Sequence, residues 1–226
     1  YQIGTVYSTG TPYGSSPTQS VPNSLRTPDL VAAVKSTIEF GLDLRFLDGK
    51  LRTDINYYKE VDEDQILSLS VPGSSGYSAS TLNAGKFTTT GWEFLVNATP
   101  IQTQDLNVDF TVNFSVYEAM VDELAEGLSA YTLENAFWGL SLFAEVGEEW
   151  GQLKTNGSYG GFEYLNGQRV VNSNGDYALK TNTNFGTISP DYTGGFLTDV
   201  SFKNFTFSAA IDFQKGGLFY SVNKQF

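Results

Sequence analysis

The strongest constraint on this chain is an alternation of apolar and polar residues that recurs along its length. Between residues 38 and 46 the apolar positions are Ile38, Phe40, Leu42, Leu44 and Phe46, and polar residues or glycine stand between them. Residues 106–116 repeat the pattern. Because successive side chains on a strand point to opposite faces, each segment is predicted to be a β-strand with one apolar and one polar face.

The same pattern predicts strands that begin near Thr37, Leu51, Phe87, Leu106, Thr193 and Phe205. Three connections between them are short, at Asp48-Gly49, Pro100 to Asp105 and Lys203-Asn204, and Asp-Gly is a strong hairpin signal. The other stretches, at about 1–33, 62–85 and 118–192, are long. The apolar start from Tyr1 to Tyr7 predicts one further short strand before the first long loop.

Two fold classes produce such alternation. A soluble β-sandwich alternates because one face of each sheet covers a core. A bacterial outer-membrane barrel alternates over segments of about ten residues, with short turns on one side of the membrane and long loops on the other. The predicted strands are long for a globular protein, and short and long connections alternate. Both features favour an all-β fold, an antiparallel transmembrane β-barrel.

A barrel fixes the direction of the side chains. The apolar set is predicted to face lipid and the charged set to face the lumen, with Trp92 in an aromatic girdle. The apolar set is Phe40, Leu42, Leu44, Ile55, Phe94, Phe110, Val112, Phe207 and Ile211. The charged set is Glu39, Asp43, Arg45, Arg52, Asp54, Glu93, Asp109 and Asp212.

Composition argues against several other functions. The chain has a formal net charge of -12, whereas nucleic-acid binding needs a basic surface. It has no His and no Cys, which removes the Ser-His-Asp triad and thiolate metal sites. Glu148 and Glu149 are adjacent, so on an extended strand they point apart and do not converge on one bond. We therefore predict no enzyme activity, no catalytic residue and no cofactor.

Two groups of loop residues are candidates for binding. Asp62, Glu63 and Asp64 supply oxygen ligands that suit calcium, but their spacing follows no known loop motif, so solvated charge is favoured and no metal site is predicted. Aromatic residues in the long stretches can stack on sugars or clamp peptide side chains, or can instead pack the loops against themselves. These aromatic candidates for contact with a substrate or a lid are Tyr77, Tyr131, Phe137, Trp138, Trp150, Tyr159, Phe162 and Tyr164.

Short motifs spread over nearly the whole chain resemble the SusC/RagA family of TonB-dependent outer-membrane transporters. The first block holds Pro28-Asp29-Leu30, Glu39-Phe40-Gly41-Leu42-Asp43, Tyr57-Tyr58, Asn83-Ala84-Gly85 and Gly91-Trp92-Glu93. The second holds Gly186, Pro190, Gly194-Gly195, Lys203-Asn204-Phe205, and Asp212 leading to Gly216-Gly217. No single motif is specific, and their order and spacing carry the resemblance.

The resemblance implies a 22-stranded barrel with an N-terminal plug and a TonB-interacting segment, in the outer membrane of a Gram-negative bacterium. It also implies import of oligosaccharides or peptides together with a SusD-like lipoprotein that closes over the mouth. The chain shows no plug and too few strands to close such a barrel. We therefore expect residues 1–226 to form part of a barrel domain, with extracellular stretches at about 1–33, 62–85 and 118–192. The alternatives are a secreted or surface β-rich glycan-binding module and a passive porin.

Overall fold

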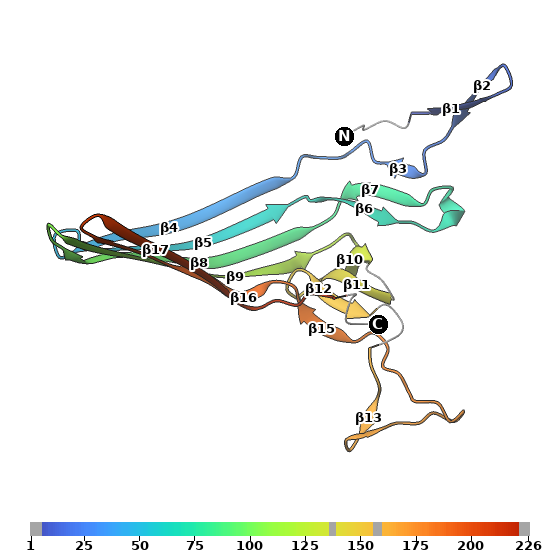
Figure 1. The fold of residues 1–226 in the computed structure, drawn as a ribbon. Coiled ribbons are helices and arrows are strands. Elements are labelled where there is room, and N and C mark those ends of the chain that lie inside the picture. The colour runs from blue at the N-terminus through green and yellow to red at the C-terminus, as the bar shows by residue number, and fades with distance from the viewer. Residues whose placement is uncertain (1–5, 136–138, 156–159, 222–226) are drawn as a thin grey trace.

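The computed structural model describes residues 6–135, 139–155 and 160–221. Its largest part is a sheet of six antiparallel strands in the order β17-β16-β9-β8-β5-β4 (Figure 1). The strands are β4 (Val34–Phe46), β5 (Leu51–Glu63), β8 (Lys86–Gln102), β9 (Leu106–Glu123), β16 (Pro190–Phe202) and β17 (Phe205–Gly216). The six strands predicted from alternation are confirmed. No helix among the described residues is long and apolar enough to cross a membrane.

A β-bulge near the end of β8 corrects one predicted boundary. We expected a connection from Pro100 to Asp105, but β8 continues to Gln102. Ala98 pairs with Phe110 and Ile101 pairs with Val108, so two residues of β8 oppose the single residue Asp109. Pro100 lies at this bulge, where a missing backbone N–H does not interrupt the ladder.

The first long stretch forms a hairpin instead of the predicted strand and loop. Tyr1 to Thr5 lie outside the described residues, and Val6 and Tyr7 are not in a strand, so the strand predicted there is wrong at those two positions. The hairpin comprises β1 (Ser8–Tyr13) and β2 (Ser16–Ser20). Gly14 has φ 60° between them, a conformation that suits a tight turn in this Ser/Thr-rich segment.

The second long stretch folds into a small three-stranded sheet. β6 (Ile66–Ser70) and β7 (Ala79–Asn83) pair antiparallel, with the 3₁₀ turn Gly73–Ser75 between them. β3 (Ser24–Arg26) from the first stretch pairs parallel with β7. The two stretches therefore meet in one layer.

The third long stretch is also folded. It contains a four-stranded sheet of β10 (Ala130–Asn135), β11 (Leu140–Glu145), β12 (Gln152–Thr155) and β15 (Asn184–Thr187). A hairpin of β13 (Tyr164–Leu165) and β14 (Gln168–Arg169) extends away from it (Figure 1). Val121 at the end of β9 and Ala144 on β11 are fully buried. Backbone hydrogen bonds join the segment after β11 to β9, because the Gly147 N–H donates to the Val121 carbonyl and the Val121 N–H donates to the Glu148 carbonyl.

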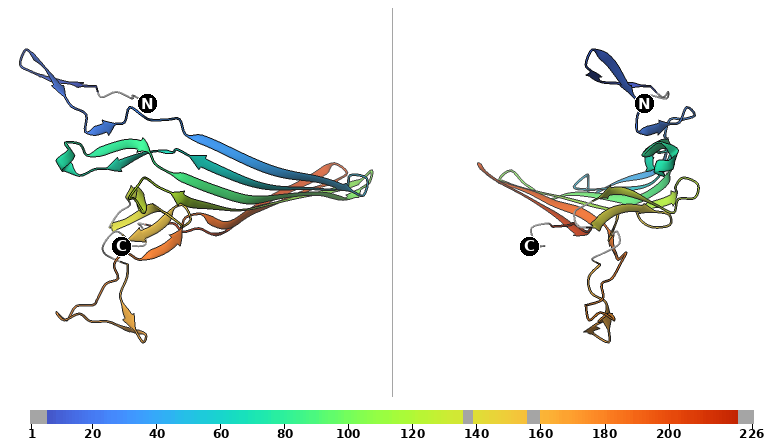
Figure 2. Two further views of the ribbon diagram at one scale, coloured as in Figure 1. Left: turned by 180° about the vertical axis from the view of Figure 1, so that it is seen from behind. Right: turned by 90° about the vertical axis from the view of Figure 1, so that its right-hand side faces the viewer.

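Short and long connections lie at opposite ends of the six-stranded sheet (Figures 1 and 2). The turns that join β4 to β5, β8 to β9, and β16 to β17 share one end, which we call the turn end. The small sheets and hairpins of the three long stretches share the other, which we call the loop end. The three folded stretches therefore lie together at one end of the sheet.

Candidate functional site

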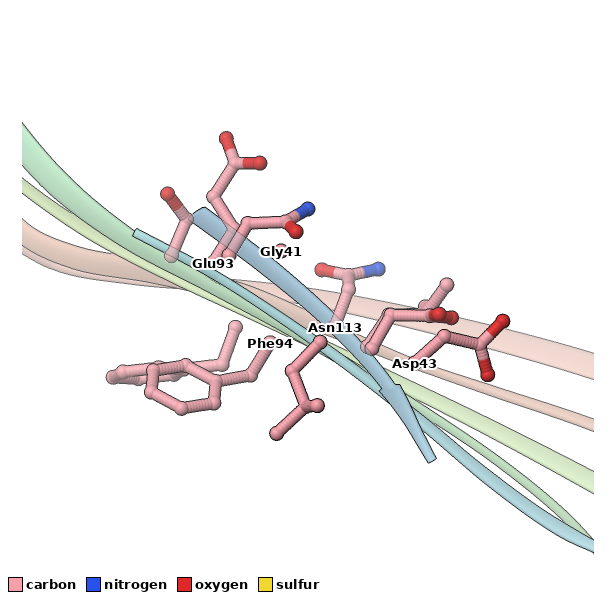
Figure 3. Close-up of a pocket in the computed structure, with 11 residues that line it drawn as sticks. Gly41, Asp43, Glu93, Phe94 and Asn113 are labelled. Carbon is pink, nitrogen blue, oxygen red and sulfur yellow. The ribbon is translucent and has the colours of Figure 1, made fainter. Parts of the chain in front are cut away.

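The six-stranded sheet has one apolar and one polar face. Register places Phe40 opposite Tyr57, Tyr57 opposite Trp92, and Trp92 opposite Val116, so apolar residues of neighbouring strands share a face. Asp43 lies opposite Asp54 on the other face. Figure 3 shows the separation at the centre of the sheet, with Glu93, Asn113 and Asp43 on one side and Phe94 on the other.

This separation holds for both predicted sets, because the pairings place every member of the apolar set on one face and every member of the charged set on the other. The apolar face is exposed: Phe40 keeps 67% and Phe207 keeps 63% of its surface accessible. In a sandwich such side chains would be covered by a second sheet. The described residues supply no such cover.

A row of aromatic rings crosses the apolar face about midway along β5, β8 and β9. Ring centroids lie 4.9 Å apart for Tyr57 and Trp92, and 6.2 Å apart for Trp92 and Phe94. The row continues from Phe94 to Phe114 at 6.3 Å and from Phe114 to Tyr192 at 5.4 Å. It thus spans β5, β8, β9 and β16. Aromatic girdles of this kind lie at the membrane–water interface of outer-membrane barrels.

The polar face carries ion pairs and a broad hollow. Arg52 lies 3.1 Å from Asp43 and 3.5 Å from Asp54, and Arg45 lies 3.2 Å from Asp43. The hollow holds about 610 Å³ (Figure 3). Its polar lining is Asp43, Asp54, Asn56, Glu93, Asn113 and Ser115. Carboxylates, amides and a hydroxyl supply both donors and acceptors, which suits a polar solute moving past this face.

A second hollow lies on the same face at the loop end, and we call it the Phe87–Trp150 pocket. It holds about 320 Å³ and is lined by Asp62, Gln65, Leu67, Phe87, Thr89, Ala119 and Trp150. The two rings meet edge to face, 4.9 Å apart at 85°. Asp62 pairs with Phe87, and the Trp150 backbone N–H donates to the Ala119 carbonyl at 2.7 Å.

The structure places Trp150 in this pocket and disperses the other described aromatic candidates. The Tyr131 hydroxyl donates to the Ser68 carbonyl at 3.1 Å, which ties β10 to β6. Tyr77 is half-buried beside the 3₁₀ turn. Tyr164 is 56% exposed on β13. These three side chains do not converge.

Phe162 has a local structural role. The Arg169 guanidinium carbon lies 4.1 Å from the Phe162 ring centroid and 5.3 Å from that of Tyr177. Cation–π contacts of this kind hold the β13–β14 hairpin together. Phe137, Trp138 and Tyr159 lie outside the described residues. Of the aromatic candidates, only Trp150 lines a pocket described here.

Sequence reasoning missed the partners of Trp150. A signal for Phe87 existed, because this aromatic residue has the parity of the polar face, where β8 otherwise carries residues such as Glu93 and Asn97. Gln65 and Leu67 gave no signal, since their approach depends on the fold of the 62–85 stretch. Contacts between residues far apart in the chain leave no local pattern.

Two of the three acidic candidates, Asp62 and Glu63, are engaged in ion pairs. The Lys35 ammonium lies 3.6 Å from Asp62, and the Lys86 ammonium lies 2.8 Å from Glu63. In the described ranges no group of three or more His, Cys, Asp or Glu side chains is placed to hold a metal ion. Glu149 forms an isolated bridge with Met120 beside the end of β9. These carboxylates lie at the loop end, beside or within the small sheets and hairpins there, which we call the loop layer.

Strand order, register and the exposed apolar face define a portion of the wall of an antiparallel membrane barrel. No model of a known protein family matches the chain. In sequence it is 22% identical over 214 residues to the TonB-dependent receptor P26 of Formosa agariphila, covering 86% of this chain and 21% of the receptor. It is 25% identical over 197 residues to the TonB-dependent receptor SusC of Bacteroides thetaiotaomicron, covering 78% and 19%.

The solved structure of the RagAB peptide transporter has the same fold, with a TM-score of 0.75 and 22% identity over 94% of this chain and 24% of that one. The chain thus spans about a fifth of the length of its curated relatives. The resemblance seen in the sequence is confirmed: the chain is similar in sequence to TonB-dependent receptors, SusC among them, and similar in fold to part of a chain of the RagAB transporter.

Proposed function

We propose that this chain is part of an outer-membrane, TonB-dependent active importer of oligosaccharides or peptides in a Gram-negative bacterium. The single observation that carries the proposal is the two-faced sheet. Its apolar face, with a row of aromatic rings, suits lipid, and its polar face suits a solute path. The similarity to TonB-dependent receptors supports TonB as the source of energy for import.

The loop end is proposed to be extracellular and the turn end periplasmic. Barrels of this type have short periplasmic turns and longer extracellular loops. The folded stretches 62–85 and 118–192 would then form part of the mouth, where a substrate arrives and a SusD-like surface lipoprotein would close. The similarity to SusC and to a chain of the RagAB peptide transporter supports a partner of this kind.

The experiment uses the full-length protein that contains this chain, expressed in its host. Uptake of labelled oligosaccharide and peptide pools is measured in cells with and without TonB. An importer of the proposed type loses uptake without TonB, whereas a passive porin retains it. A protein recovered from the soluble fraction without detergent would instead support the secreted glycan-binding module.

The lipoprotein partner is tested separately, by purification from the outer membrane in mild detergent. A stoichiometric lipoprotein that leaves only when the detergent is exchanged for a harsher one supports the lid. Purification of the transporter alone under all conditions would contradict it.

A further inference from the structure

The Phe87–Trp150 pocket is a site that the transporter proposal alone does not define. Resting on that proposal, we infer that this pocket binds one neutral sugar unit of an oligosaccharide on its way into the barrel. The residues of β5, β8 and β9 that line it have the parity of the polar face, because Asp62 opposes Phe87 and Thr89 opposes Ala119. A solute moving along this face from the loop end meets the pocket before the hollow at Glu93.

The apolar part of the pocket fits the C–H surface of a sugar ring. Phe87 and Trp150 meet edge to face at 85°, so they form a corner, and Leu67 and Ala119 extend its apolar lining. Neither ring is fully buried. Glycine at position 85 leaves room for the Phe87 ring, because a Cβ there would lie 2.9 Å from it. Aromatic faces favour stacked contact with flat apolar surfaces.

The polar part of the pocket fits sugar hydroxyls. The Asp62 carboxylate accepts hydrogen bonds, whereas the Gln65 amide and the Thr89 hydroxyl both donate and accept. Sugar hydroxyls also do both. With about 320 Å³, the pocket is near the lower limit of ligand sites and suits one unit of a polymer.

The charge around the pocket favours a neutral sugar over an acidic one. No Lys or Arg lines the pocket, and the nearby Lys35 already pairs with Glu60 and Asp62. A uronic or sulfated unit would bring its negative charge against Asp62 without a free counterion.

Backbone geometry argues against an extended peptide. Peptides commonly bind by adding a strand to an open sheet edge. The pocket lies over β5, β8 and β9. At this level β5 and β8 are paired on both sides within the six-stranded sheet, and the side of β9 beyond Ser115 is covered by the segment of Trp150, whose N–H donates to the Ala119 carbonyl. These three strands therefore offer no open edge for backbone pairing, and the side chains around the corner provide a compact subsite.

The test presents three pools to the full-length protein purified in detergent. They are neutral oligosaccharides from partial hydrolysis of starch, cellulose, xylan and mannan, acidic oligomers from alginate, and a tryptic digest of casein. Ligands that stay bound through gel filtration are identified by mass spectrometry. We expect retention of neutral oligosaccharides alone. Retention of peptides or alginate oligomers in their place, or of no neutral oligosaccharide, overturns the inference.

Variants locate the binding. Trp150→Ala should lower retention at least about fivefold, because a stacked ring contributes on the order of 1 kcal/mol. Asp62→Asn should also weaken it. Glu63→Gln is the matched control. Glu63 follows Asp62 in the chain, but its carboxylate has the opposite parity on β5 and pairs with Lys86. Tyr177→Ala, beside the β13–β14 hairpin, controls for loss of a loop aromatic.

Equal retention by wild type and Trp150→Ala would place the sugar elsewhere and overturn the assignment. The transporter proposal is read separately, from TonB-dependent uptake. If TonB-dependent uptake persists and the protein retains peptides in place of sugars, the transporter proposal stands and the sugar-binding inference is wrong.

Discussion

The ring of Tyr58 on β5 lies across Gly91 on β8, its directly opposed partner on the polar face. A Cβ on Gly91 would come within 2.5 Å of the Tyr58 ring, closer than side chains pack. Gly91→Ala should therefore displace the ring and destabilise the folded wall by about 1–3 kcal/mol, the usual cost of overpacking. The measurement is the fraction of heat-modifiable, folded protein in outer membranes.

The control for Gly91→Ala is Gly73→Ala, because a Cβ at Gly73 would meet nothing within 4 Å. Adding Tyr58→Ala to Gly91→Ala should restore part of the folded fraction. Normal assembly of the single variant would contradict the close contact.

The two faces of the sheet should respond differently to a charge. Ile211 is 59% exposed on the apolar face of β17, two residues nearer the turn end than Phe213, which lies level with Phe114 of the aromatic row. Ile211→Arg should cost up to about 2–4 kcal/mol, the cost at the bilayer midplane. Asn113→Arg, on the polar face, should cost much less. Urea unfolding of the full-length protein in lipid vesicles measures both, and equal losses would reject the lipid assignment.

Surface labelling tests the orientation of the two ends. The chain has no Cys, so single cysteines can be introduced at Ser75 at the loop end and at Gln104 at the turn end. An impermeant thiol reagent on intact cells should modify Ser75→Cys and leave Gln104→Cys unmodified. After lysis both should react. Labelling of Gln104→Cys alone on intact cells would invert the orientation.

Low pH should stabilise the part of the loop layer around Glu149. Burial raises the pKa of the Glu149 carboxyl above its usual range, and the nearby charges of Glu118, Asp191 and Glu148 act in the same direction. The folded state therefore holds this proton more tightly than the unfolded state. Its stabilising effect is present at low pH and is lost as pH rises through the raised pKa.

Glu149→Gln should make the backbone around residues 147–151 exchange hydrogen more slowly at neutral pH and reduce the pH dependence of that exchange. Hydrogen exchange followed by mass spectrometry measures it. The control is Glu163→Gln, because Glu163 is not among the charges that act on Glu149. Faster exchange at neutral pH in Glu149→Gln would contradict the sign.

Strand positions could be predicted because the alternation is local. Phe40, Leu42 and Leu44 show their shared face within five residues of sequence, and a turn such as Asp48-Gly49 fixes where the chain reverses. The β8 bulge was missed because Pro100 is an ordinary end-of-strand signal, and only the pairing with Asp109 shows that the strand continues.

The loop layer could not be predicted in the same way. Its strands are short, at four to six residues in the four-stranded sheet, so alternation has little length in which to show. The burial of Val121 and Ala144 and the meeting of Phe87 with Trp150 depend on contacts between distant segments. Such contacts follow from the fold, not from neighbouring residues.

The long insertion between β9 and β16 leaves and returns through adjacent strands, which are paired up to Ser115 and Thr193. Its two attachment points therefore keep a fixed spacing set by the wall, whatever sequence lies between them. The insertion can be treated as an exchangeable cassette. Grafting residues 124–189 between related barrels would transfer the Trp150 side of the pocket while the recipient's own β5 and β8 supply the other side.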